Sequence, residues 1–256
     1  MRVIRSVLFY VMLIVSTFFV GIAAMLVYFA THRREWAHLC ARFWGKINLW
    51  AAGVTVYVAG VENIQPERAY IFAANHQSWF DIFAVLAKLP TQFRWLAKHE
   101  LFRIPILGQA MTATGYIPID RSDRRKAFES LRQAAMQAKR GTSIVIFPEG
   151  TRSPDGVLQE FKKGGFILAL ESQQPMVPIS ISGSHRILPK RGEWLIQPGI
   201  IDITICKPIP TADFTMADRN TLMSLVRQAM RENLTESEGG LQPDHAKDIH
   251  RVYSHD

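Results

Sequence analysis

Several common signatures of enzyme chemistry are missing from this chain of 256 residues. Its two cysteines, Cys40 and Cys206, are too few for a disulfide scaffold or for a metal site built from cysteine. No G-x-S-x-G sequence is present, so the usual nucleophile elbow of serine hydrolases is absent. The usual nucleotide-binding glycine motifs are absent too, and His99-Glu100 lacks the second histidine of a zincin site. We therefore expect neither a metal nor a bound cofactor.

The composition is that of a globular chain with an excess of basic residues. Hydrophobic residues make up 48% and charged residues 20%, which supports a real core and argues against disorder. The formal net charge of +8 favours a polyanionic partner, which can be nucleic acid, an anionic membrane or a phosphorylated ligand. The basic residues are spread along the chain rather than gathered with aromatic residues, so we expect no binding to nucleic acid.

The N-terminal segment favours the membrane among these partners. No charged residue occurs from Val7 to Ala30, and a helix of that length rises ~36 Å, enough to cross a hydrocarbon core of ~30 Å. A cleaved signal peptide has a shorter apolar region followed by a small-residue cleavage site, which this segment lacks. We predict that residues 1–50 form membrane-anchoring helices in a lipid bilayer.

The segment from Glu35 to Trp50 is amphipathic, with large apolar residues at mostly helical spacing and basic residues between them. This pattern fits a helix in the membrane interface, a helix that turns the first one back so that neither crosses, or a helix packed on the globular domain. Basic residues are more numerous after the apolar run than before it. The rest of the chain is therefore expected in the cytoplasm if the first helix spans the membrane.

Short apolar or β-branched runs alternate with helical stretches through the middle of the chain. The runs are Val54–Ala59, Tyr70–Ala74, Phe93–Ala97, Tyr116–Ile119, Ser143–Phe147, Val177–Ile181 and Ile200–Ile205. The helical stretches are Ser78–Leu89, Arg124–Arg140, Lys163–Ser172 and Ala217–Leu234. This order predicts an α/β domain over residues 51–234, with a mixed or largely parallel sheet flanked by helices. Residues 235–256 are polar and predict a mobile tail, in which His245, His250 and His255 are solvated rather than ligands.

The first candidate site lies where a predicted strand ends and a helix begins, in the sequence N-H-Q-S-W-F-D. His76 can act as a general base if a carboxylate fixes its tautomer, and Asp81 can lie behind it across such a turn. A structural alternative makes Ser78 the helix N-cap with Asp81 at position N3, close to a capping box. The H-x4-D spacing alone is a weak signal in a chain with eight histidines.

Two further segments place an arginine just after a predicted strand. G-Y-I-P-I-D-R ends in Arg121, which can form a fork onto a phosphate or pair with a neighbouring aspartate. F-P-E-G-T-R-S contains Gly150, which allows the backbone to approach a ligand closely, and Arg152, which can bind an anion. Glu149 can orient either arginine. The structural alternative is a strand-end turn with a surface salt bridge.

Together these segments resemble the motifs of the glycerolipid acyltransferase family. N-H-Q-S-W-F-D matches its H-x4-D motif, G-Y-I-P-I-D-R its second motif, F-P-E-G-T-R-S its third and V-P-I around Pro178 its fourth. A further similar segment, A-K-H-E-L, contains Lys98. The second motif departs from the family at Tyr116 and Pro118, where phenylalanine is common. The likeness covers residues 54–210 and is closest to bacterial members that acylate 1-acyl-sn-glycerol 3-phosphate.

The resemblance implies transfer of a fatty acyl group from acyl carrier protein or coenzyme A to the 2-hydroxyl of lysophosphatidic acid, giving phosphatidic acid. His76 would be the general base, with Asp81 stabilising its imidazolium. The implied substrate-binding residues are Lys98, Arg121, Glu149, Gly150, Thr151 and Arg152. The implied location is a bacterial inner membrane, with the catalytic domain on the cytoplasmic side. Two alternatives stay open: a sister enzyme for another lysolipid, and a non-catalytic membrane-anchored module that binds anionic lipids.

Overall fold

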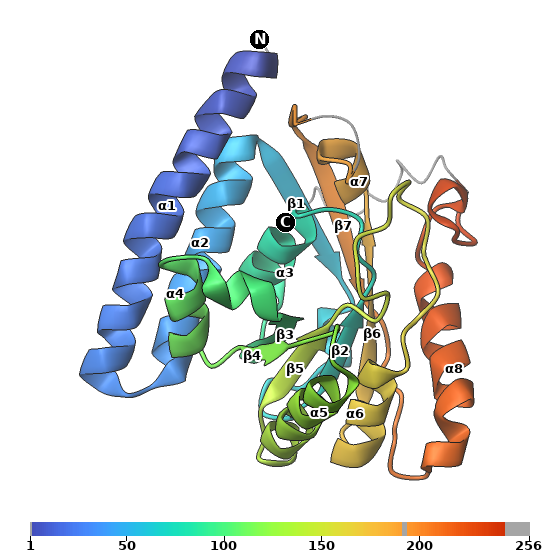
Figure 1. The fold of residues 1–256 in the computed structure, drawn as a ribbon. Helices are drawn as coiled ribbons and strands as arrows, with labels where there is room; N and C mark the ends of the chain where they lie inside the picture. The colour runs from blue at the N-terminus through green and yellow to red at the C-terminus, as the bar shows by residue number, and fades with distance from the viewer. Residues whose placement is uncertain (1, 191–193, 244–256) are drawn as a thin grey trace.

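The centre of the molecule is a seven-stranded sheet, seen in a computed structural model that describes residues 2–190 and 194–243 (Figure 1). The strands are β1 (Val54–Ala59), β2 (Ile71–Ala74), β3 (Phe93–Lys98), β4 (Ile117–Ile119), β5 (Ser143–Ile146), β6 (Met176–Ser182) and β7 (Gly199–Ile205). Their order in the sheet is β1-β7-β6-β2-β5-β3-β4. The β6–β7 pair is antiparallel and the other pairs are parallel, which confirms the predicted α/β class.

Helices cover both faces of this sheet (Figure 1). On one side lie α1 (Arg2–Thr31), α2 (Arg34–Ala52), α3 (Phe80–Lys88), α4 (Leu107–Ala113) and the short α7 (Ser184–Ile187). On the other lie α5 (Arg124–Lys139), α6 (Gly164–Ser172) and α8 (Arg219–Arg231). Single 3₁₀ turns are η1 (Val61–Asn63), η2 (His99–Arg103), η3 (Met216–Asp218) and η4 (Glu236–Glu238).

The central strands form two hydrophobic cores, one on each face. Successive side chains of a strand point to opposite faces, so Phe72 of β2 belongs to the core with Phe83 of α3, and Ile71 belongs to the core with Phe166 of α6. Every residue of β2, β5 and β6 is buried. Burial on both faces explains why these strands are continuous apolar runs in the sequence rather than alternating ones.

The helices α1 and α2 form a hairpin that packs against the domain. A Cβ atom on Gly45 of α2 would lie 2.9 Å from the carbonyl oxygen of Phe83, so α2 approaches α3 at a distance that only glycine permits. Near one end of α1, Ser6 Oγ accepts a hydrogen bond from Ile196 N at 3.0 Å. Farther along the helix, a Cβ atom on Gly21 would lie 2.7 Å from the side chain of Ile106. Of the three interpretations of residues 35–50, packing on the domain is thus observed.

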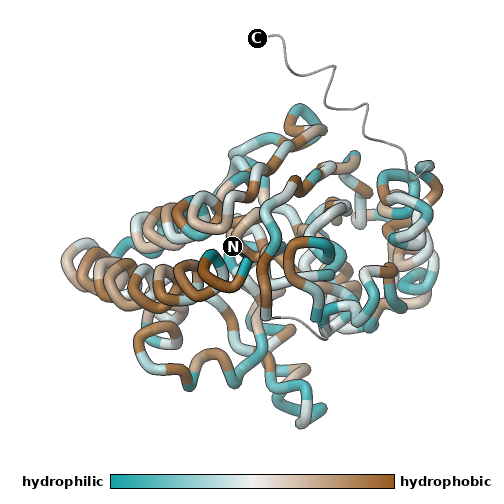
Figure 2. Tube along the Cα trace, turned by 90° about the horizontal axis from the view of Figure 1, so that it is seen from above, coloured by the Kyte–Doolittle hydropathy of each residue, from teal (hydrophilic) through white to brown (hydrophobic). Residues whose placement is uncertain are grey.

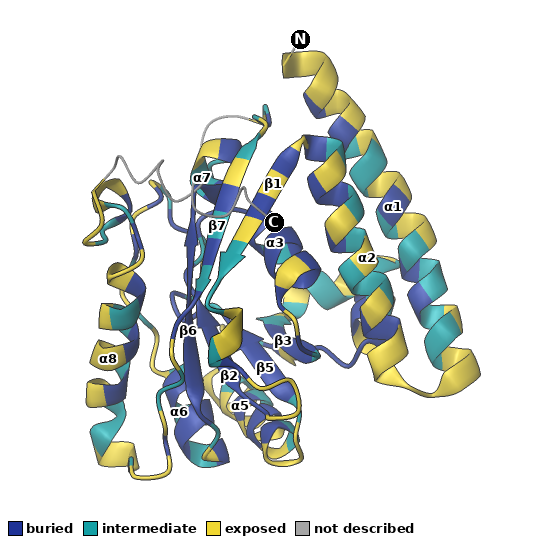
Figure 3. Ribbon diagram, turned by 180° about the vertical axis from the view of Figure 1, so that it is seen from behind, coloured by how far each residue is buried: buried dark blue, intermediate teal, exposed yellow. Residues whose placement is uncertain are grey.

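The outward faces of both helices are apolar and exposed. Figure 2 shows α1 as largely hydrophobic, and Figure 3 shows exposed residues along both helices. We call this surface the hairpin face; its residues are Val3, Ile4, Val7, Leu8, Val11, Ile14, Val15, Phe18, Phe19, Leu26, Phe29, Trp36, Leu39, Phe43 and Trp50. By length and composition α1 is able to cross a membrane.

Two segments differ from the sequence prediction. We predict no helix between the third and fourth strands, but η2 and α4 lie there. The short α4 is stabilised by packing against α1, which the sequence pattern of α4 does not indicate. We predict a mobile tail from residue 235, but the carboxylate of Glu238 is buried and accepts hydrogen bonds from Ser182 Oγ at 2.6 Å and Gly183 N at 2.8 Å. The polar sequence gave no sign of this contact, because the contact is made by hydrogen bonds and not by apolar side chains. His245, His250 and His255 lie outside the described residues.

Candidate active site

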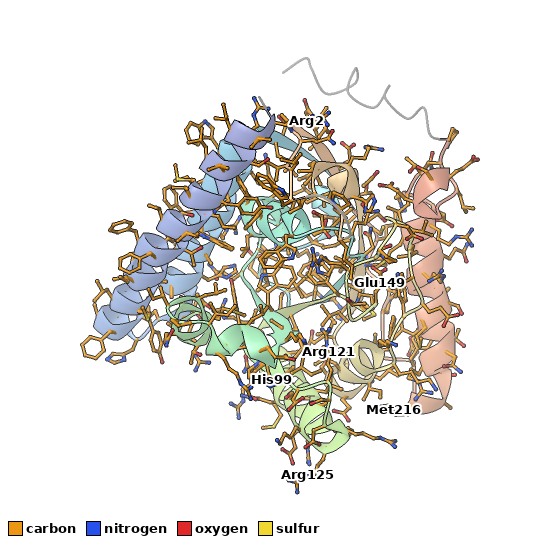
Figure 4. All side chains as sticks on the ribbon, turned by 45° about the horizontal axis from the view of Figure 1, so that its top comes forward. Arg2, His99, Arg121, Arg125, Glu149 and Met216 are labelled. Carbon is orange, nitrogen blue, oxygen red and sulfur yellow. The ribbon has the colours of Figure 1, made fainter. Side chains whose placement is uncertain are left out.

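The motif segments meet at one edge of the sheet. Strands β2, β3, β4 and β5 are parallel, so their carboxyl ends lie at the same edge. The segment Asn75–Asp81 follows β2, Lys98 ends β3, Arg121 follows β4 and the segment Phe147–Ser153 follows β5. In Figure 4, Arg121 and Glu149 lie between the N-terminal helices and α8. The strand order therefore gathers groups that are far apart in the sequence.

Asp81 both orients His76 and holds the turn that precedes α3. Its Oδ2 lies 2.8 Å from His76 Nδ1 and accepts hydrogen bonds from the backbone N–H groups of Gln77 at 2.7 Å and Ser78 at 2.8 Å. Asp81 is fully buried. The capping alternative made Ser78 the N-cap, but the N-cap is Trp79 and has no side-chain cap, so this carboxylate holds the turn before the helix instead. Because Nδ1 faces Asp81, Nε2 is the nitrogen of His76 left for proton transfer.

Glu149 holds the main chain of His76. Its Oε1 accepts a hydrogen bond from His76 N at 2.5 Å, and its Oε2 accepts one from Gln159 N at 2.9 Å. Ser153 N donates to the carbonyl oxygen of His76 at 2.7 Å. Burial raises the pKa of Glu149 to about 7, against the two backbone hydrogen bonds, which lower it. We predict from sequence that Glu149 orients an arginine; its carboxylate instead contacts these two backbone groups.

The ring of His76 is stacked on Phe147, which is itself stacked on Trp95. Its centroid lies 3.8 Å from that of Phe147, with the planes 9° apart, and Trp95 stacks on the far side of Phe147 at 5.1 Å. The stack fixes the plane of the imidazole while Asp81 fixes its rotation. Sequence reasoning missed Trp95, and it used Phe147 only as the first letter of a motif. The signal in the sequence was the place of both residues, within or just after a buried strand.

An apolar cavity of about 320 Å³ lies against His76. Its apolar wall comes from the hairpin, α3, β3, η2 and α4 and includes Trp44, Phe83, Leu101 and Met111. Six predicted site residues line it: His76, Lys98, Arg121, Gly150, Thr151 and Arg152. The other two, Asp81 and Glu149, are buried behind it and support His76. We refer to this space as the main cavity.

The two arginines of the main cavity carry charge that is available to an anion. Burial lowers the pKa of Arg121 and of Arg152, yet a guanidinium stays charged at neutral pH. Neither arginine forms an ion pair with a carboxylate of the described residues. Arg121 donates to the carbonyl of Gly150, whose φ of +77° favours glycine, and Arg152 lies 5.5 Å from the ring centroid of Trp79. Lys98 is paired with Glu100 at 2.7 Å.

The described residues contain no group of three or more His, Cys, Asp or Glu side chains arranged to hold a metal ion. The chemistry that the site can perform follows from the residues already named. A histidine with one free nitrogen can move a proton, an apolar cavity can hold a hydrocarbon chain, and unpaired guanidinium groups can hold a phosphate.

Known proteins similar to this chain share one description. Residues 55–182 match a family model described as Acyltransferase. A chloroplastic 1-acyl-sn-glycerol-3-phosphate acyltransferase of Brassica napus is 35% identical over 182 residues, covering 71% of this chain and 52% of that protein. A 1-acyl-sn-glycerol-3-phosphate acyltransferase of Saccharomyces cerevisiae is 34% identical over 209 residues, covering 80% of this chain and 67% of that protein.

A solved structure is also similar over nearly its whole length. The crystal structure of PlsC, the 1-acyl-sn-glycerophosphate acyltransferase of Thermotoga maritima, matches with a TM-score of 0.78 and 30% sequence identity. The match covers 91% of this chain and 96% of that chain, so it extends beyond the family model into the N-terminal helices. The chain spans only about half the length of the chloroplastic relative.

Proposed function

This chain belongs to the acyltransferase family, and we propose that it moves a fatty acyl group from a thioester to the 2-hydroxyl of 1-acyl-sn-glycerol 3-phosphate, giving phosphatidic acid. The thioester donor is acyl carrier protein or coenzyme A. One observation carries the proposal: the His76–Asp81 pair faces an apolar cavity that Arg121 and Arg152 also line. The cavity suits a fatty chain, the arginines suit a phosphate, and the histidine suits a hydroxyl group.

In the proposed reaction, His76 Nε2 takes the proton of the acceptor hydroxyl as its oxygen attacks the thioester carbonyl carbon. A C–O bond forms, the C–S bond breaks, and the imidazolium returns the proton to the leaving thiolate. Asp81 stabilises the imidazolium through Nδ1. Glu149 and Phe147 act as positioning residues, since one holds the main chain of His76 and the other its ring.

The acceptor phosphate binds to the cations of the main cavity. Arg121 and Arg152 offer planar donor groups, which can form paired hydrogen bonds to two phosphate oxygens. Lys98 adds a point charge from the end of β3, and Gly150 and Thr151 form the loop between the arginines. Fixing the phosphate fixes the 2-hydroxyl beside Nε2, which lowers the entropic cost of the reaction.

We propose that the hairpin lies in one leaflet of a membrane, rather than that α1 crosses it alone. The first turns and the second half of α1 both contact the domain, through Ser6 with Ile196 and Gly21 with Ile106. A helix that crossed the bilayer would therefore bring the domain into it. The hairpin face is exposed and apolar, as insertion requires. The basic chain suits an anionic leaflet, and in a bacterium this is the cytoplasmic face of the inner membrane.

The test is acyl transfer by the purified full-length protein in lipid vesicles, with a panel of lysolipid acceptors and both donors. Preferential acylation of 1-acyl-sn-glycerol 3-phosphate supports the proposal. A preference for another lysolipid would instead identify the sister enzyme. Binding to anionic vesicles without transfer from either donor would overturn the catalytic assignment and leave the lipid-binding module.

A further inference from the structure

A second cavity of about 260 Å³ adjoins the main cavity. Trp79, Phe83 and Arg152 line both spaces and therefore form the boundary between them. The far wall of the second cavity consists of Phe9 and Leu13 of α1, with Tyr10 between them. A cationic group, an apolar wall and direct contact with the membrane-facing helix are thus combined in one small space.

Lys190 brings another positive charge to this cavity. It follows α7 and lies beyond residues 55–182 of the family match, so no motif contains it. Its Nζ donates to the carbonyl oxygen of Arg152 at 2.6 Å and to Thr151 Oγ1 at 3.1 Å. An ammonium group has three donors, so one is left. No carboxylate among the described residues forms an ion pair with Lys190 or Arg152.

The segment that carries Lys190 is tied to the turn that carries His76. The carbonyl oxygen of Leu188 accepts a hydrogen bond from Ser78 Oγ at 2.8 Å, and the N–H of Ser78 donates to Asp81. Lys190 is therefore placed relative to the candidate base by a short chain of hydrogen bonds. Tyr10 of α1, which also lines the second cavity, donates to the carbonyl oxygen of Trp194 at 2.9 Å and so ties the helix to the domain.

We infer that the second cavity holds the chain of the acceptor, whose phosphate lies at the boundary with the main cavity, an inference that rests on the proposed acyl transfer. Lys190 joins Arg152 in binding the phosphate of the lysolipid at the boundary of the two cavities, and the single chain of the lysolipid lies along Phe9 and Leu13. The main cavity is then free for the acyl chain of the donor. The acceptor is placed here because this space combines the cations Arg152 and Lys190 with an apolar wall from Phe9 and Leu13, as the phosphate and the chain of a lysolipid require.

The first experiment replaces Lys190 by methionine, which keeps the length of the side chain and removes the charge. Calorimetry measures binding of 1-acyl-sn-glycerol 3-phosphate and of 1-monoacylglycerol with the same chain, and transfer assays measure kcat/KM for both. Lys190→Met should weaken the phosphate-bearing acceptor about tenfold and leave the other unchanged. Lys190→Arg should restore much of the loss. Lys207→Met, at an exposed lysine that lines neither cavity, is the matched control.

The outcomes separate this inference from the proposed function. An equal loss for both acceptors would mean that Lys190 supports the loop, and the inference would be withdrawn. A loss that appears with acyl-coenzyme A but not with acyl carrier protein would assign Lys190 to the donor, with the same consequence. If the wild-type protein transfers no acyl group but Lys190→Met still weakens lysophosphatidate binding, the reaction fails while the phosphate site stands.

A second variant tests where the acceptor chain lies. Leu13→Trp reduces the space in the second cavity, so it should slow transfer to a long-chain lysolipid more than transfer to a short-chain one. The preference among donor chain lengths should stay as in the wild type. Thermal unfolding by circular dichroism checks that the hairpin remains packed. A changed donor preference with an unchanged acceptor preference would overturn the assignment of the two cavities.

Discussion

Asp81 serves two purposes, and asparagine at this position separates them. Oδ2 accepts hydrogen bonds from His76, Gln77 and Ser78, while Oδ1 is buried without a partner among the described residues. In Asp81→Asn the amide oxygen takes the place of Oδ2, because the opposite orientation would point an NH₂ group at two backbone N–H donors. The variant should therefore keep the turn and the tautomer of His76 and remove only the negative charge.

Two estimates bound the effect on turnover. A hydrogen bond to a charged partner contributes about 1 kcal/mol more than a neutral one, which corresponds to roughly a fivefold to tenfold change in rate. Coulomb's law for unit charges ~4 Å apart at an effective dielectric constant of ~20 gives ~4 kcal/mol, or roughly 10³-fold. We expect kcat to fall by about 10²-fold, between these limits. The buried amide N–H groups at the position of Oδ1 should lower the stability by ~1–3 kcal/mol.

The assay compares kcat and the unfolding temperature of the wild type, Asp81→Asn and Asp123→Asn. Asp123 is the matched control, because it caps α5 by accepting from the N–H groups of Arg125 and Lys126 but contacts no histidine. Its variant should lose at most ~1 kcal/mol of stability and no activity. Wild-type kcat in Asp81→Asn, with a stability loss like that of the control, would refute a catalytic role for the carboxylate.

Four other perturbations follow from the structure. Burial raises the pKa of the Glu149 carboxyl group from 4.5 to about 7, so its ionisation in the folded protein costs stability as the pH rises from 4.5 to 7. Over this range, urea unfolding should show the stability of the wild type falling by up to ~3 kcal/mol relative to that of Glu149→Gln. A difference in stability that does not change with pH would contradict the raised pKa. Arg152→Lys should lower kcat/KM at least ~10-fold for phosphate-bearing acceptors alone, since an ammonium cannot form the fork, and an equal loss with monoacylglycerol would remove the phosphate assignment. Gly45→Val should push α2 away from α3, costing ~1–3 kcal/mol in chemical unfolding, and an unchanged midpoint would disprove the close packing. Replacing Phe43 and Trp50 together by serine should weaken sedimentation with vesicles while changing stability by less than ~1 kcal/mol, because both side chains are exposed; unchanged sedimentation would exclude the hairpin face as the membrane contact.

The fold and the central pair of the site were predictable because both depend on local patterns. Each predicted strand corresponds to an observed one, since a strand buried on both faces is a continuous apolar run with turn residues at its ends. The His76–Asp81 pair was predictable because five residues across a strand-to-helix turn leave little freedom. The strands follow from their hydrophobic pattern, and the two residues of the pair are close together in the sequence.

The rest depends on contacts between distant segments, which leave no local pattern. Glu149 was found as a motif residue, but the sequence does not show whether a glutamate binds a backbone N–H group or an arginine. Lys190 was missed because a lone lysine in a loop reads as an ordinary surface residue. Only the structure shows that it contacts Arg152. Glu238 was missed because the end of β6, its binding partner, is some fifty positions earlier in the chain.

The packing of α1 also constrains the order in which the parts of the protein fold. This helix leaves the ribosome before the domain, and its contacts there include Ile106, on the turn before α4, and Ile196, which are synthesised much later. Until the domain is made, the side of α1 that packs on it has no partner, and neither has the hairpin face. Insertion into a bilayer would keep such an apolar segment from aggregating. Docking of the helix then also completes the walls of both cavities. Both cavities are therefore complete only once α1 has docked on the domain.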